Sequence, residues 1–242
     1  MNRDHSHWHS PALDRDMELL VFGHAGARVL AFPTSMGRFY QWEDFGMVAA
    51  LGQHLEQGWL QVYCVDSIDD ESWYAKTTPP DERVRRHEQY ERYLLDEVLP
   101  HSRDRNPNPY LIAAGASFGA YHAINLALRH PDVVDRALGM SGLYDIEAFV
   151  GGFGEAVYFQ NPVAYMANET DPARLAALRH LDIILAIGRD DPSCSSNEKL
   201  SGILWSKDIW HALRIWDGWA HDWPWWRQMV TRYIGGHDEG HQ

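Results

Sequence analysis

A serine flanked by glycines offers the chain a nucleophile, in the run Gly115–Ala116–Ser117–Phe118–Gly119. The run follows an apolar strand-like segment, YLIAA, and precedes a helix-like one, AYHAINLALRH. At a sharp strand-to-helix turn the serine hydroxyl projects from the backbone, and glycines two positions away on either side avoid Cβ collisions. The short pattern alone is a weak signal. Its position between a strand and a helix predicts that Ser117 attacks a carbonyl carbon.

A serine hydroxyl is a weak nucleophile at neutral pH and needs an imidazole to accept its proton. The chain has fourteen histidines, and chain order selects one, since a serine at such a turn is followed by its acid and then by a histidine after the last strand. His221 comes just after the last predicted strand, 211–218, and is the predicted base. His122 lies five residues after Ser117 in the next helix, so its ring is expected to point away from the turn.

The third member of such a site is a carboxylate that orients the imidazole and stabilises its cation. The predicted strand 181–188 ends in Gly188–Arg189–Asp190–Asp191, where this acid is expected. Asp191 is the predicted acid and Asp190 the alternative. Asp145, after the preceding strand, is a third candidate.

Two backbone amides are expected to bind the negative oxygen of the tetrahedral intermediate. The first is the N–H of Phe118, next to the nucleophile at the positive end of the following helix. The second is expected in the loop 34–37, which follows the strand 27–33. Ser35 is favoured there, and Met36 is the alternative.

Substrate contacts are predicted in two segments besides that loop, where Met36 is also expected to touch substrate. Trp73 and Tyr74 follow the strand 60–66 and are expected at the active face. Tyr158 and Phe159 belong to the irregular segment 145–178. Ordinary anchoring of a loop is the alternative for each of these four aromatic residues.

Strand-like and helix-like segments alternate along the chain, which predicts one α/β domain over 1–242, with a mostly parallel sheet and helices on both faces. The segments 17–23 and 27–33 flank His24–Ala25–Gly26 and are expected to form an antiparallel hairpin. Residues 1–14 and 236–242 are expected to be flexible. The segment 145–178 is expected to form an insertion or lid over the active site, at the carboxyl ends of the strands.

The formal net charge of −13 argues against a nucleic-acid partner, which needs clustered Lys and Arg. No apolar run approaches the roughly 20 residues that span a bilayer, and the N-terminus has no apolar signal segment. A cytoplasmic protein that binds no membrane is therefore expected. Its expected partner is a small-molecule ester.

No cofactor, metal site or disulfide is predicted. His5, His7 and His9 alternate but are expected to lie in a frayed terminus, and Cys64 and Cys194 lie in unlike settings. Seven of the eleven tryptophans lie between 205 and 226. A packed C-terminal core is the main interpretation of this cluster, with one or two of these residues touching substrate, and a wall for an apolar substrate is the alternative. Exposed tryptophans would favour a homodimer.

The segments 115–145, 188–191 (GRDD) and 218–226 (GWAHDWPWW) resemble the esterase D group of α/β-hydrolases, which includes S-formylglutathione hydrolase, enterochelin esterases and mycolyltransferases. The resemblance covers most of the chain. It implies the α/β-hydrolase fold and a serine carboxylic-ester hydrolase that forms an acyl-enzyme with small or medium acyl esters. The family's nucleophile maps onto Ser117, its base onto His221 and its acid onto Asp191. The chain has FPTSMG where members of the group often carry LHG or LDG, which leaves the second amide donor and the substrate open.

Two other functions use the same residues differently. An acyltransferase would use the same triad with an alcohol in place of water. A catalytically silent binding protein of the same fold is the other alternative, and the complete set of Ser117, Asp191 and His221 argues against it.

Overall fold

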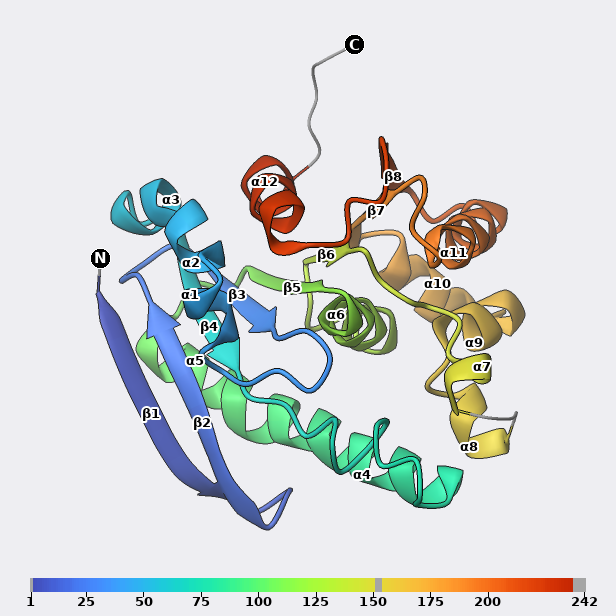
Figure 1. Ribbon diagram of the computed structural model, residues 1–242, viewed down its shortest axis with the longest axis horizontal. Helices are drawn as coiled ribbons and strands as arrows, with labels where there is room; N and C mark the ends of the chain where they lie inside the picture. The colour runs from blue at the N-terminus through green and yellow to red at the C-terminus, as the bar shows by residue number, and fades with distance from the viewer. Residues whose placement is uncertain (1, 151–153, 237–242) are drawn as a thin grey trace.

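One mixed sheet runs through the molecule. The computed structural model describes residues 2–150 and 154–236, and within them eight strands lie in the order β1-β2-β4-β3-β5-β6-β7-β8 (Figure 1). Their bounds are β1 Arg3–Ser10, β2 Arg15–Phe22, β3 Ala27–Phe32, β4 Leu60–Val65, β5 Leu111–Ala116, β6 Arg136–Met140, β7 Asp182–Gly188 and β8 His211–Trp216. The β1–β2 and β2–β4 pairs are antiparallel, and the other neighbours are parallel. The predicted mostly parallel sheet is confirmed.

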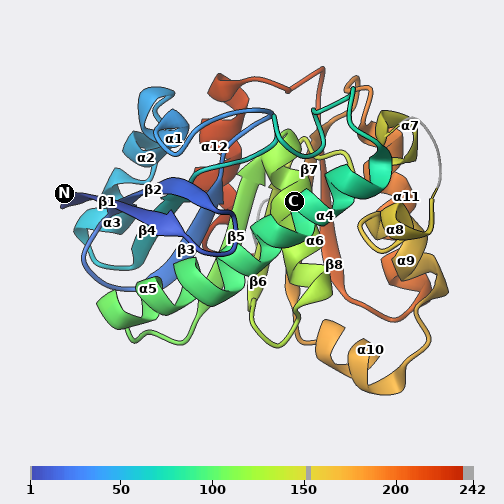
Figure 2. The same cartoon turned by 90° about the horizontal axis from the view of Figure 1, so that it is seen from below.

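Helices cover both faces of the sheet, as the sequence predicts. One face packs against α4 (Pro80–Tyr93), its π-helical continuation Leu94–Val98, α5 (Leu99–Arg105) and α6 (Phe118–Arg129), which Figure 2 shows crossing the sheet. Residues of α9 (Pro162–Asn168), α10 (Pro172–Leu178) and α11 (Cys194–Ser206) pack on the same face. The other face packs against α1 (Gln41–Asp44), α2 (Met47–Ala50), α3 (Gly52–Glu56) and α12 (Trp223–Tyr233).

The central strands β4 and β5 are buried at every position. A parallel strand covered on both faces needs apolar side chains throughout, and LQVYCV and LIAAGA largely supply them. Because β3, β5, β6, β7 and β8 run parallel to one another, their carboxyl ends share one edge of the sheet, where the loops that follow them meet.

The predicted hairpin between 17–23 and 27–33 is wrong, because β4 lies between β2 and β3 and pairs with both. The connection passes close to the start of β4, where a Cβ on Gly26 would lie 2.1 Å from the Trp59 carbonyl carbon. Gly26 also has a φ of 93°, which glycine adopts without strain. A short glycine-containing link thus joins two strands that are not neighbours.

The expected flexibility of residues 1–14 is also wrong for the strand 3–10, and residue 1 lies outside the described residues. Strand β1 pairs with β2 from Arg3–Phe22 to Ser10–Arg15. Glu97, in the π-helical turn, accepts hydrogen bonds from Trp8 Nε1 at 2.8 Å and from Ser10 Oγ at 2.8 Å. Polar residues thus form an ordered edge strand because β2 and the half-buried Glu97 supply hydrogen-bond partners.

The segment 145–178 forms four short helices, α7 (Glu147–Val150), α8 (Glu155–Tyr158), α9 and α10, with 151–153 outside the described residues. Ile146, Val150 and Val157 pack in one apolar cluster with Phe118. This part of the segment therefore lies beside the predicted nucleophile, while α9 and α10 pack on the face of the sheet. Of the tail 236–242, only Gly236 is described.

The predicted C-terminal tryptophan core is mostly wrong. Trp226 is buried at 4% exposure, but four members of the cluster are exposed, namely Trp205, Trp210, Trp219 and Trp225. A homodimer stays a prediction. Cys64 and Cys194 are free cysteines, and no helix in residues 2–150 or 154–236 is long and apolar enough to cross a bilayer.

We expect His87 to make the fold sensitive to acid. Its ring is buried beside Trp73, Tyr121 and His122, and burial lowers its pKa from 6.5 to about 3. As the pH falls, His87 therefore takes up a proton in the unfolded chain before it does so in the folded one. The contribution of the neutral, buried ring to the free energy of unfolding is intact above pH 6.5 and is lost as the pH falls toward 3. Urea unfolding across this range should show the free energy of unfolding falling by up to about 1.4 kcal/mol per pH unit. His87→Leu should flatten that slope, whereas His180→Gln, at an exposed histidine, should leave it unchanged.

Candidate active site

Ser117 lies at a strained turn between β5 and α6. Its φ of 55° and ψ of −122° are unfavourable for a residue with a Cβ, and its N–H donates to Met140 O at 2.8 Å. A Cβ on Gly115 would lie 2.1 Å from Gly119 O, and one on Gly119 would lie 2.3 Å from Pro33 O. Both glycines of the motif are therefore needed for close backbone approach, and the hydroxyl is presented at the carboxyl edge of the sheet.

The structure brings Ser117, His221 and Asp191 together from loops that follow β5, β8 and β7. His221 Nε2 lies 3.1 Å from Ser117 Oγ, and His221 Nδ1 lies 2.6 Å from Asp191 Oδ2. Asp191 is only 4% exposed and its other oxygen accepts the N–H of Ser193 at 2.8 Å. With the Nδ1 proton held by this carboxylate, Nε2 is free to accept the proton of the serine hydroxyl.

The loop that carries His221 is held by a residue that the sequence analysis did not single out. Ser141, just after β6, donates from its Oγ to Ala220 O at 3.2 Å, and it accepts from Trp226 Nε1 at 3.0 Å. Trp219 stacks on the His221 ring, with ring centroids 5.4 Å apart. These contacts restrict the imidazole to the side facing Ser117. The short run MSG after a strand was too common a pattern to reveal this role.

The two alternative acids lie elsewhere. Asp190 is exposed, and its backbone N–H donates to Gly218 O at 3.0 Å. Asp145 makes an ion pair with Lys199 at 2.6 Å and accepts from Asn161 Nδ2 at 3.0 Å. Although partial burial acts to raise the pKa of Asp145, its hydrogen bonds with Lys199 and Asn161 lower it overall. Only Asp191 of the three candidates contacts His221.

The loop 34–37 has one amide left for an oxyanion. Thr34 N donates to Gln41 Oε1 at 2.7 Å, Met36 N to Asp69 Oδ2 at 3.1 Å and Gly37 N to Thr34 O at 2.8 Å. Within residues 2–150 and 154–236, neither the Ser35 amide nor the Phe118 amide has a hydrogen-bond acceptor. These contacts favour Ser35 over Met36 as the partner of Phe118.

The residues predicted to contact substrate differ in their exposure and in their distance from the triad. Met36 is 54% exposed. Tyr74 lies beside Phe118, with ring centroids 5.4 Å apart, and its hydroxyl donates to Ser35 Oγ at 2.7 Å. The prediction for Trp73 is wrong, because its side chain is fully buried against His87 and Tyr121 and cannot reach a substrate.

The structure does not bring Tyr158 and Phe159 to Ser117. They line a separate hollow that Arg129 also lines, and Arg129 Nη1 donates to Phe159 O at 2.6 Å. Arg129 ends α6, whereas Ser117 precedes it, so the two ends are about 16 Å apart along the helix. The contacts described for this pair thus lie toward the far end of α6 from Ser117, and its contact with substrate stays a prediction.

Comparisons with known proteins agree with this fold. A family model described as putative esterase matches residues 60–234, more than half of the chain. A sequence comparison with curated proteins returned no match. The structure is similar to that of a ferulic acid esterase, with a TM-score of 0.77 and 19% identity over 95% of each chain. It is also similar to an S-formylglutathione hydrolase from Agrobacterium tumefaciens, with a TM-score of 0.73 and 14% identity over 96% of this chain and 93% of that one.

Proposed function

Since the chain belongs to the putative esterase family, and is a serine ester hydrolase of the α/β-hydrolase fold, we propose that Ser117, His221 and Asp191 are its catalytic triad. The observation that carries this proposal is the continuous pair of hydrogen bonds from Asp191 through His221 to Ser117. A family model and a fold do not say which residues react, so the assignment depends on this geometry.

In the proposed reaction, His221 Nε2 takes the proton of Ser117 as Oγ bonds to the ester carbonyl carbon. The carbonyl oxygen becomes an oxyanion that accepts hydrogen bonds from the amides of Phe118 and Ser35. When the intermediate collapses, the bond to the alcohol oxygen breaks and His221 returns its proton to the leaving alcohol. A water then gives a proton to His221 as its oxygen bonds to the acyl carbon. When this second intermediate collapses, the bond from the acyl carbon to Ser117 Oγ breaks, the carboxylic acid is released and His221 returns its proton to Oγ.

The proposed substrates are esters with small or medium acyl groups. Exposed apolar side chains lie close to the triad, because Trp219 stacks on His221 and Met36 adjoins Ser35. Solved structures of similar fold include proteins named for esters as different as ferulic acid esters and S-formylglutathione. A panel of p-nitrophenyl esters of graded acyl length should therefore locate the acyl preference of this chain.

We expect water, rather than an added alcohol, to be the main acyl acceptor. The His221 side chain is 24% exposed, so water can reach the base that must activate it. With an aryl acetate and an added alcohol such as glycerol, chromatography should show acetic acid as the main product. Glycerol acetates as the main product would instead make the chain an acyltransferase. Ser117→Ala is the control and should form neither product above the uncatalysed rate.

A further inference from the structure

Asp69 is a buried carboxylate that contacts both elements carrying the predicted oxyanion donors, the loop 34–37 and α6. It is 1% exposed and follows β4 in the segment 66–71. Its Oδ2 accepts the Met36 N–H at 3.1 Å, in the loop that offers the second oxyanion donor. Its Oδ1 lies 2.8 Å from His122 Nε2, on the helix α6 that begins with the first donor. A single carboxylate thus joins two elements that are otherwise separate in the sequence.

The hydrogen bond to Met36 stabilises an unfavourable turn. Gly37 N donates to Thr34 O at 2.8 Å, which closes a turn around Ser35 and Met36. Met36 has a φ of 54°, in the left-handed region that residues with a Cβ seldom adopt. Because the Thr34 carbonyl is engaged inside this turn, the N–H of the same trans peptide, that of Ser35, points away from it. The direction of the Ser35 amide therefore depends on the turn that Asp69 holds.

His122 holds the carboxylate against the helix. The His122 ring is 4% exposed and meets Phe118 edge to face, with ring centroids 5.1 Å apart. The expectation that this ring points away from Ser117 therefore missed its role, since it reaches sideways to Asp69.

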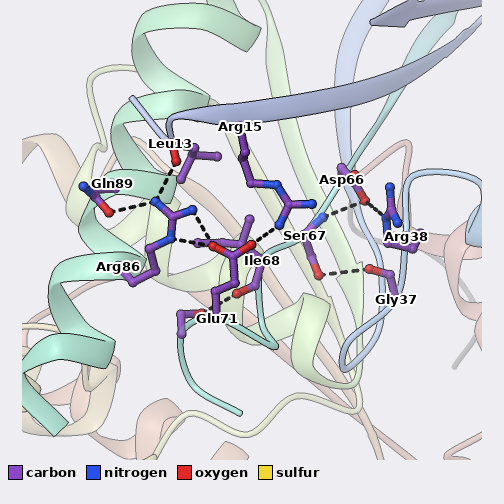
Figure 3. Close-up of polar contacts among 11 residues, drawn as sticks. Leu13, Arg15, Gly37, Arg38, Asp66, Ser67, Ile68, Glu71, Arg86 and Gln89 are labelled. Carbon is purple, nitrogen blue, oxygen red and sulfur yellow. Dashed lines mark hydrogen bonds and ion pairs between the residues drawn. The ribbon is translucent and has the colours of Figure 1, made fainter. Parts of the chain in front are cut away.

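The segment that carries Asp69 is itself anchored at both ends, as Figure 3 shows. Near its start, Ser67 Oγ donates to Gly37 O at 2.9 Å. At its end, Glu71 makes ion pairs with Arg15 and Arg86. Arg86 also donates to Leu13 O at 2.9 Å, which fixes the segment to the turn between β1 and β2. The segment that carries Asp69 is thus held in place by contacts at both of its ends.

We propose that Asp69, held by His122, is a positioning residue that sets the direction of the Ser35 amide toward the oxyanion. This inference rests on the proposed function, because it needs an acyl transfer to Ser117. Asp69 does not touch the reacting atoms and acts only through Met36 and α6. Its loss should weaken binding of the transition state and leave binding of the ground state nearly unchanged.

The test compares Asp69→Asn with Asp70→Asn, at the exposed neighbouring carboxylate of the same segment. The concentration of working sites is first measured by titration with a fluorophosphonate, so that kcat is given per reactive Ser117. Asp69→Asn should lower this kcat about 10- to 100-fold with KM within about twofold, since losing a whole oxyanion donor costs about 10²- to 10³-fold. The inhibition constant of a trifluoromethyl ketone, which forms a tetrahedral adduct, should rise in parallel. Asp70→Asn should change neither the melting temperature nor kcat per site.

A kcat per titrated site within twofold of wild type in Asp69→Asn would overturn the inference. If that variant does not fold, His122→Phe serves instead, because it keeps an aromatic ring against Phe118 but cannot donate to Asp69, and a several-fold fall in kcat at constant KM is expected. An unchanged kcat in His122→Phe would likewise overturn the inference. Failure of the proposed function is a different result, since wild-type protein would then not be labelled at Ser117.

Discussion

Ser117→Ala is expected to lower kcat for p-nitrophenyl acetate by a factor on the order of 10⁴ or more, to a residual rate from the oxyanion donors and substrate binding. Among the described residues, the only side-chain hydrogen bond of Ser117 is the one with His221. The His221 side chain is partly exposed, so water can replace the serine hydroxyl in Ser117→Ala. Alanine keeps the Cβ that the turn already accommodates, and the melting temperature should therefore change little. Steady-state hydrolysis and thermal unfolding measure the two effects.

Ser195→Ala is the matched control for this variant, because Ser195 is exposed and lies on α11 near the start of that helix. It should keep wild-type kcat. Full activity in a folded Ser117→Ala protein would remove this serine from the mechanism.

Asp191→Asn is expected to lower kcat by about 10³- to 10⁴-fold, because an asparagine amide favours the wrong tautomer of the imidazole. The carboxylate is buried and lies 2.6 Å from His221 Nδ1. An amide that donates toward Nδ1 would leave the proton on Nε2, where it blocks transfer from Ser117. The fall should appear in kcat more than in KM, since the interaction acts after the substrate has bound.

Asp190→Asn supplies the comparison within the same loop. Its side chain is exposed and makes no contact with His221, so kcat should stay within a few-fold of wild type. A larger loss in Asp190→Asn than in Asp191→Asn would reassign the acid.

The turn that carries the nucleophile could be predicted from the sequence because it depends on residues that are close together in the chain. Ser117 needs close backbone approach on both sides, and only glycines at 115 and 119 allow it. His221 and Asp191 follow strands whose carboxyl ends meet at one sheet edge, so chain order was sufficient to bring them near Ser117.

Strand pairing was harder to predict because it depends on partners far away in the chain. Strand β4 inserts between β2 and β3, and no property of residues 17–33 reveals that. The polar segment 3–10 is a strand only because β2 and Glu97 provide its hydrogen bonds. Local composition predicts flexibility there, and tertiary contacts override it.

The sequence also did not predict the direction in which individual side chains point. Trp73 and Tyr74 are adjacent, yet one is fully buried and the other reaches Ser35. His122 and Asp69 looked unrelated in sequence, and only the packing of α6 against the segment 66–71 brings them together. A sequence pattern places a residue on an element but does not fix where its side chain ends.

Covalent labelling tests the central claim most directly. Wild-type protein treated with a fluorophosphonate should gain one phosphonyl group, and peptide mass spectrometry should place it on Ser117. His221→Ala should react far more slowly, because the imidazole no longer accepts the serine proton. A stoichiometric label on another residue, or no label on active wild-type protein, would contradict the account.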